Sequence, residues 1–186
     1  MMIKTCIAVA VTLTVCTLAA TSMAGNDGTI EFTGAISSTT CKVEGGAAGI
    51  GTADKSVDLG NVSIANLAAT GERAGSRGFE IIIGGAGDGG CTNGQTARVR
   101  FDPTSPAIDT ASGRLNLDAS ASTAGNVQIE VADRDGTPIN LYTEDSQRVT
   151  IANNQAVIPL MGRYYATGVA TAGDANSRVA FQIIYD

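Results

Sequence analysis

Apolar residues alternate with polar or small residues along almost every hydrophobic segment after residue 28. The last eight residues are typical, because Val179, Phe181, Ile183 and Tyr185 occupy every second position. A period of two places successive side chains on opposite faces of an extended chain, whereas a helix repeats every 3.6 residues. The pattern therefore predicts strands that each have one apolar face, and it restricts the chain to an all-β fold.

Turn-forming residues divide this alternating pattern into many short strands. We expect strands at 29–36, 78–85, 97–102, 113–120, 126–133, 139–142, 156–168 and 179–185. Asp135-Gly136 is a favoured turn pair and predicts a turn at 133–138. Only 62–71 could hold a helical turn, which Gly71 would end. Short strands with frequent turns predict a single antiparallel β-sandwich domain.

The first 24 residues have the features of a secretory signal peptide. Lys4 supplies a positive charge, residues 7–20 are apolar and uncharged, and 22–24 supply the small residues of a cleavage site. The alternative is a membrane anchor, but the apolar run is short for a span of about 20 residues and no basic residues follow it. We therefore expect residues 1–24 to be removed and the rest of the chain to be exported.

The charge of the chain argues against two classes of partner. The formal net charge is −6, and it becomes −7 when Lys4 leaves with the leader. A negative protein is repelled by the phosphates of nucleic acid and by anionic membrane surfaces. We expect neither nucleic-acid binding nor direct membrane insertion.

Catalysis finds little support in the sequence. There is no histidine, so a Ser-His-Asp or Cys-His arrangement and a histidine-ligated metal are both excluded. Neighbouring acids such as Asp133 and Asp135 lie in turn-like contexts where solvated carboxylates are ordinary. The glycine-rich segment 84–90 lacks the Lys-Ser/Thr ending of a phosphate-binding loop. We expect no enzymatic activity, no cofactor and no metal.

Two cysteines remain after the leader is removed. Cys6 and Cys16 leave with it, and Cys41 and Cys91 stay. An even pair in an exported chain predicts a disulfide, which would close a loop of about 50 residues and add roughly 3–4 kcal/mol. The alternative, a metal site with two thiolates, lacks histidine partners.

Several motifs occur in a fixed order along residues 25–186. They are GTIEFTG (28–34), TTC (39–41), VDLGNV (57–62), LAATG (67–71), GFEIII (78–83), NVQIEVADRDGTPINL (126–141) and IPLMGRYYATGVATAGDANSRVAFQIIYD (158–186). In this order and spacing they resemble the structural subunits of chaperone–usher pili, most closely the major subunit of type 1 fimbriae. The sequence departs from that family in the glycine-rich loop before Cys91 and in the 49 residues between the cysteines, which puts the shape of one loop in doubt.

The resemblance implies an incomplete immunoglobulin-like sandwich with six main strands, whose seventh strand comes from a partner. Residues 41–186 would form this pilin domain. Residues 25–40 would form an N-terminal extension that donates a strand to the next subunit. The missing strand would leave a groove beside the last strand, which is lined by Val179, Phe181, Ile183 and Tyr185. The terminal carboxylate of Asp186 would be anchored by a periplasmic chaperone.

The proposed donor strand follows the same alternation. One face carries Gly28, Ile30, Phe32, Gly34 and Ile36. Burial of its three large side chains in a neighbour's groove would stabilise the contact by roughly 5–8 kcal/mol. Gly34 interrupts the apolar row, which close backbone approach in a shallow part of the groove would explain.

The function implied by the resemblance is a fimbrial structural subunit that polymerises by donor-strand exchange into a surface filament for adhesion or biofilm formation. Its partners would be other subunits, a periplasmic chaperone and an outer-membrane usher. The chain would cross the periplasm and act outside the cell. The alternative is a minor adapter or tip subunit, or an adhesin that binds glycans through Tyr164 and Tyr165.

Overall fold

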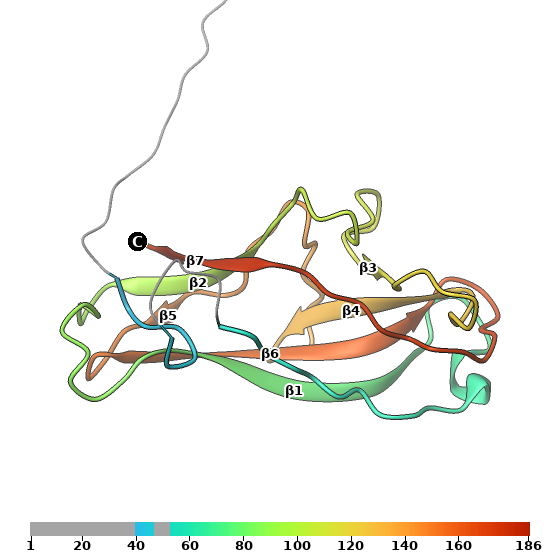
Figure 1. The fold of residues 1–186 in the computed structure, drawn as a ribbon, viewed down its shortest axis with the longest axis horizontal. Coiled ribbons are helices and arrows are strands. Elements are labelled where there is room, and N and C mark those ends of the chain that lie inside the picture. Colours follow the sequence, from blue (N-terminus) through green and yellow to red (C-terminus); the bar gives the residue numbers. More distant parts are fainter. Residues whose placement is uncertain (1–39, 47–52) are drawn as a thin grey trace, which may run out of the picture. The chain divides into compact units, whose positions relative to one another are not determined.

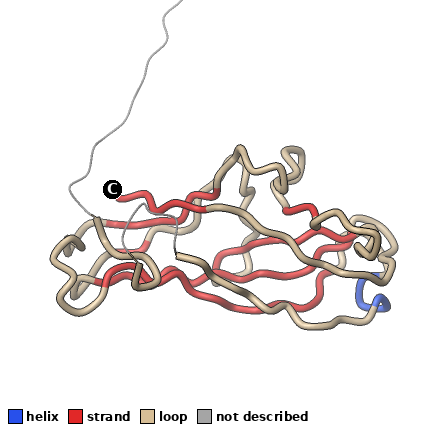
Figure 2. The backbone as a smooth tube through the Cα atoms, viewed as in Figure 1, coloured by secondary structure: helices blue, strands red, loops and turns tan. Residues whose placement is uncertain are grey.

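The computed structural model describes residues 40–46 and 53–186. The predicted signal peptide and the predicted donor residues Gly28, Ile30, Phe32, Gly34 and Ile36 lie outside the described residues. The described residues are built almost entirely of strands and loops, with one short 3-10 helix among them (Figures 1 and 2).

Two antiparallel sheets form the domain. The strands are β1 (Arg73–Gly84), β2 (Thr96–Phe101), β3 (Leu115–Asn116), β4 (Val127–Asp133), β5 (Val149–Thr150), β6 (Gln155–Ala166) and β7 (Phe181–Tyr185). One sheet has the order β1-β6-β4-β3, and the other has the order β5-β2-β7. Figure 1 shows the long β1 and β6 in one layer and β2 and β7 in the other. The expected all-β two-sheet fold is confirmed.

The predicted alternation determines which side chains form the core. In β6, every second residue from Ala156 to Ala166 is buried, and the residues between them are more exposed. The paired side chains Ile81 of β1 and Ile158 of β6 are both nearly inaccessible to solvent. Since these rows face the inner side of the second sheet, most of the apolar burial that stabilises the domain lies between the two layers.

The first described segment, residues 40–46, lies along the outer edge of β1. Val43 forms an isolated bridge with Ile83, and the amide of Glu44 donates to the carbonyl of Ile82 at 2.8 Å. Cys41 and Cys91 form the predicted disulfide. Nearby, the Thr40 amide donates to the Gly90 carbonyl at 2.8 Å. The disulfide therefore joins this first segment to the loop that leads into β2.

Several strand boundaries differ from the predictions. β1 begins five residues before the expected 78, β3 covers only two residues of 113–120, and β5 was not expected. Residues 139–142 form no strand, although Ile139 and Leu141 are buried as an alternating pattern requires. The backbone turns here because Asn140 accepts amides of the following residues through its carbonyl and its side chain.

The two predicted turns are present. The amide of Gly136 donates to the carbonyl of Asp133 at 2.9 Å, and Gly136 has a φ of 86°, which glycine adopts without strain. The 3-10 helix η1 (Ile64–Leu67) lies within the expected 62–71. No helix in the part of the chain that the structure describes is long and apolar enough to span a membrane.

Candidate functional site: the uncovered edge of the last strand

Strand β7 lies at the edge of the smaller sheet. It pairs with β2 in an antiparallel register that matches Phe101 with Phe181, Val99 with Ile183 and Ala97 with Tyr185. Among residues 40–46 and 53–186, no other strand pairs with β7. Its second edge is therefore a row of backbone groups that could accept a further strand.

The backbone groups on that edge can be assigned from the hydrogen bonds to β2. Thr96 and Asp186 exchange two backbone hydrogen bonds of 2.9 Å each, so Asp186 directs its amide and carbonyl toward β2. Backbone groups of neighbouring residues in an antiparallel strand point in opposite directions. Tyr185, Ile183 and Phe181 therefore direct their amides and carbonyls toward the uncovered edge.

The side chains at this edge are only partly covered. In β2, Ala97 and Val99 are completely buried and Phe101 is 6% exposed. The residues paired with them in β7 share the same face of the sheet, yet all three are only half-buried. They pack against the main core together with Val179, which precedes β7 and is also half-buried. The core thus ends at β7 with apolar surface that is still accessible.

The acceptor residues predicted from the sequence are brought together here. Phe181, Ile183 and Tyr185 lie in one row of β7, and Val179 lies just ahead of the strand rather than in it. The Tyr185 hydroxyl is buried without a hydrogen-bond partner among the described residues. Burial raises the pKa of Tyr185, and nearby Asp88 raises it further. A neutral phenol adds no charge to this edge.

The side chain of Asp186 lies on the opposite face of this sheet. Its carboxylate accepts the Arg148 Nε at 3.0 Å and also contacts the guanidinium of Arg98. These contacts involve the side-chain carboxylate. The predicted anchoring of the terminal carboxylate by a chaperone stays a prediction.

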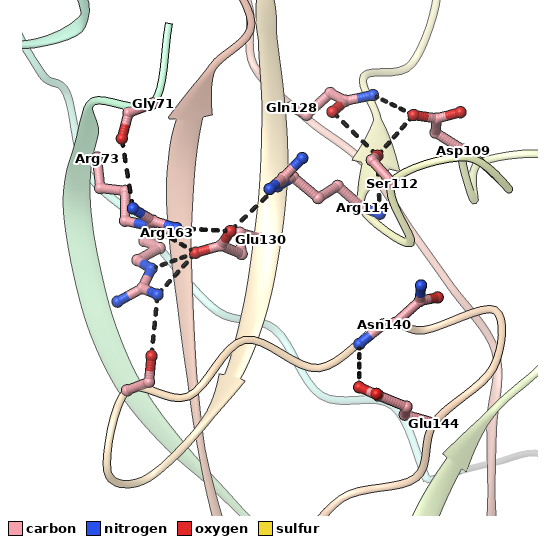
Figure 3. A network of polar contacts seen from close by, with 11 residues as sticks. Gly71, Arg73, Asp109, Ser112, Arg114, Gln128, Glu130, Asn140, Glu144 and Arg163 are labelled. Atoms are coloured by element: carbon pink, nitrogen blue, oxygen red, sulfur yellow. Dashed lines mark hydrogen bonds and ion pairs between the residues drawn. The ribbon is translucent and has the colours of Figure 1, made fainter.

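The larger sheet carries a separate polar cluster on its outer face (Figure 3). Glu130, which is 1% exposed, accepts Arg73 Nε at 2.7 Å, Arg163 Nε at 2.8 Å and Arg114 Nε at 3.0 Å. Burial alone would raise the pKa of Glu130, but the three arginines outweigh it and hold the pKa at about 2. A carboxylate that stays ionised and fully paired is suited to holding strands together and not to general acid–base catalysis.

The two adjacent tyrosines do not form an open sugar-stacking surface. Tyr164 is only 9% exposed and faces the core. Tyr165 faces outward, but the guanidinium of Arg114 lies 3.6 Å from the centre of its ring and that of Arg73 lies 5.1 Å away. No cluster of side chains suited to a metal ion occurs within the described residues.

Comparison with known proteins identifies the family of this chain. The family model described as "Fimbrial protein" matches residues 30–186. The chain belongs to the fimbrial protein family. The match includes both the row of β7 and the segment 30–36, in which the donor strand was predicted.

Relatives of this fimbrial protein match it over most of their length. It is 32% identical over 165 residues to the type-1 fimbrial protein A chain of Escherichia coli K12, covering 86% of this chain and 84% of the relative. It is 36% identical over 179 residues to the major fimbrial subunit SMF-1 of Stenotrophomonas maltophilia, covering 91% and 99%.

Solved structures show that the fold is shared. The domain is similar to a subunit in a chaperone–usher pilus structure, with a TM-score of 0.56, 18% identity, and coverage of 90% of this chain and 100% of that one. It is also similar to the P pilus rod subunit PapA, with a TM-score of 0.55, 20% identity, and coverage of 80% and 100%. Both likenesses place this fimbrial protein in the same immunoglobulin-like fold.

Two charged groups of this fimbrial protein were not predicted from the sequence. One is the cluster around Glu130. The other joins Asp186 to Arg98 of β2 and to Arg148, which directly precedes β5. The spacing of Arg98 and Arg100 was a usable signal, because residues two apart lie on one face of a strand. Their acidic partners come from distant segments, which spacing within one strand does not identify.

Proposed function

We propose that this protein is a structural subunit of a chaperone–usher fimbria and that it polymerises by donor-strand exchange. The observation that carries the proposal is the half-buried apolar row of β7 beside the fully buried row of β2. An inserted strand would cover this row and bond to the backbone groups at the uncovered edge, which is a known mode of strand addition. Residues 28–36 of a neighbouring subunit are the proposed strand.

The alternation of the donor segment fits this edge. Ile30, Phe32 and Ile36 would lie on the same side of an extended strand and could pack against Phe181 and Ile183. Each subunit would offer one donor and one acceptor, so the contact would be heterologous and would extend into a filament. Membership of the fimbrial family supports the same assembly.

Export and partners follow from this proposal. A subunit with accessible apolar surface at a sheet edge needs protection before assembly, since such edges promote aggregation. A periplasmic chaperone would cover β7 during export, and an outer-membrane usher would pass the subunit to the cell surface. The signal peptide predicted at 1–24 would direct the chain into this route.

The test uses the exported chain with its own donor strand disabled by Phe32→Asp. A synthetic peptide of residues 26–38 is added to the oxidised protein, and thermal unfolding is followed by circular dichroism. We expect a saturable rise in Tm, and no rise with a peptide that carries the same Phe32→Asp change. If the wild-type peptide leaves Tm unchanged, β7 is not an acceptor and the proposal fails.

The length of the filaments formed by the wild-type chain distinguishes a rod subunit from a minor adapter subunit. A rod subunit should form long filaments on its own, because each added copy presents a new acceptor edge. A minor adapter should stop at short assemblies. Electron microscopy of the purified, oxidised wild-type chain gives this answer directly.

A further inference from the structure

The apolar pattern of β7 does not fix its register at the end of the chain. Val179, Phe181, Ile183 and Tyr185 occupy every second position, and all four are half-buried. Strict alternation would penalise a shift of one residue, because the shift turns every side chain to the other face. A shift of two residues carries no such penalty, because Val179, Phe181 and Ile183 would then occupy the places of Phe181, Ile183 and Tyr185 and Gln182 would stay on the outer face. Some other contact must exclude that shift.

An alternating chain of charges crosses the outer face of the same sheet. Its members, in spatial order, are Arg148, Asp186, Arg98, Asp145 and Arg100. The separations are 3.0 Å from Arg148 Nε to Asp186, 2.7 Å from Arg98 Nε to Asp145 and 2.7 Å from Arg100 Nε to Asp145. Arg98 also contacts Asp186.

The members of this chain come from both sides of β2. Arg98 and Arg100 belong to β2 itself, and Asp145 bridges to Arg100 on the side where β5 pairs. Asp186 follows β7 on the other side. The charge chain therefore links the three-stranded sheet across its full width.

Asp186 compensates a repulsion within this chain. Arg98 and Arg148 both contact the carboxylate of Asp186, so these two positive charges lie close together on the outer face of the sheet. Like charges directly opposite each other on neighbouring strands destabilise a sheet. The carboxylate of Asp186 contacts both guanidinium groups and offsets their repulsion. It can do so only while β7 keeps the observed register.

We propose that Asp186 is a register lock, a positioning residue that holds the acceptor edge of β7 in the one register that faces Phe181, Ile183 and Tyr185 toward an incoming strand. This role rests on the proposed function. A β7 that slips by two residues would present Val179, Phe181 and Ile183 in their place, and the donor strand would no longer meet its matching apolar row.

The test compares Asp186→Asn and Arg148→Gln with a matched control in the oxidised chain that carries Phe32→Asp. The control is Arg178→Gln, which removes an exposed ion pair with Asp118 of 2.9 Å outside β7. Hydrogen exchange of the backbone amides of Gln182, Ile184 and Asp186, which are directed toward β2, is measured first. We expect about fivefold faster exchange with Asp186→Asn, a smaller increase with Arg148→Gln, which keeps the contact between Asp186 and Arg98, and no change in the control.

A double variant and added salt sharpen this measurement. Asp186→Asn combined with Arg148→Gln should exchange no faster than Asp186→Asn alone, since Asp186→Asn already removes the pair with Arg148 and the second change relieves the repulsion between Arg148 and Arg98. The difference from wild type should shrink at high salt, because Arg148 and Asp186 are 61% and 41% exposed. Unchanged exchange in both single variants, or an equal effect of the control, would overturn the lock.

Capture of the peptide of residues 26–38 separates the lock from the proposed function. The lock predicts slower association with Asp186→Asn than with the control variant. Equal association rates together with unchanged exchange would refute the lock and leave strand addition standing. Failure of the peptide to bind any variant would refute the proposed function, while the exchange data would still report on the lock.

Discussion

Replacing Glu130 with glutamine should destabilise the domain, and the loss should depend on pH in a defined way. Glutamine keeps the shape of the side chain and removes the charge that faces Arg73, Arg114 and Arg163. The carboxyl group has a pKa of about 2 in the folded domain and an ordinary value of 4.5. A difference of that size corresponds to about 3 kcal/mol of folding free energy at neutral pH.

The direction of the pH dependence follows from the lowered pKa. The stabilisation by ionised Glu130 is fully present above pH 4.5 and is lost as the pH falls from there to about 2. Below that range the wild-type side chain is protonated and resembles glutamine. The stability difference between wild type and Glu130→Gln should therefore be constant at neutral pH and should approach its minimum near pH 2.

Urea unfolding of the oxidised protein, followed by circular dichroism between pH 2 and 7, measures this difference. Glu80→Gln serves as a control, because Glu80 is an exposed acid of β1 in the same sheet. We expect its effect to stay within about 0.5 kcal/mol at every pH. A stability difference for Glu130→Gln that is small at pH 7, or that does not change between pH 5 and 2, would refute the reasoning.

Three further predictions concern the disulfide, two glycines with positive φ and a buried acid. Replacing Cys41 and Cys91 with serine should cost about 4 kcal/mol, measured as a fall in Tm that reduction of the wild type reproduces. Gly84→Ala should destabilise the domain more than Gly87→Ala. Both glycines have a positive φ, but only a Cβ at position 84 would meet the disulfide sulfur of Cys91, at 2.7 Å. Equal losses of stability in urea unfolding would contradict this. Asp133→Asn should not lower stability at pH 7, because burial raises the pKa of Asp133 and the folded domain disfavours its charge; a clear loss in the same assay would contradict it.

The strands with strict alternation were predictable, and the interrupted ones were not. β6 and β7 follow from period two because one face of each packs against the core. The segment 139–142 has the same pattern, but Asn140 offers its side chain to the following amides and the backbone turns. β5 has only two residues, and a pattern needs more than two positions to be recognised.

The candidate site was predictable in its apolar part only. The row of Phe181, Ile183 and Tyr185 follows from alternation within one segment. The contacts of Asp186 depend on how β2 and β5 pair with β7, which brings together residues 38 positions or more apart in the sequence. Charged pairs of this kind are set by the topology of the sheet and not by local periodicity.

The disulfide has a mechanical consequence for a filament of such subunits. Tension applied through an inserted strand would enter at β7 and pass by backbone hydrogen bonds to β2. From there it would reach Cys91, which lies five residues before β2, and cross the covalent bond to Cys41 at the root of the next donor segment. This covalent route runs through the smaller sheet and the disulfide, so a pulled fibre could transmit force from subunit to subunit without unfolding β6 and β4.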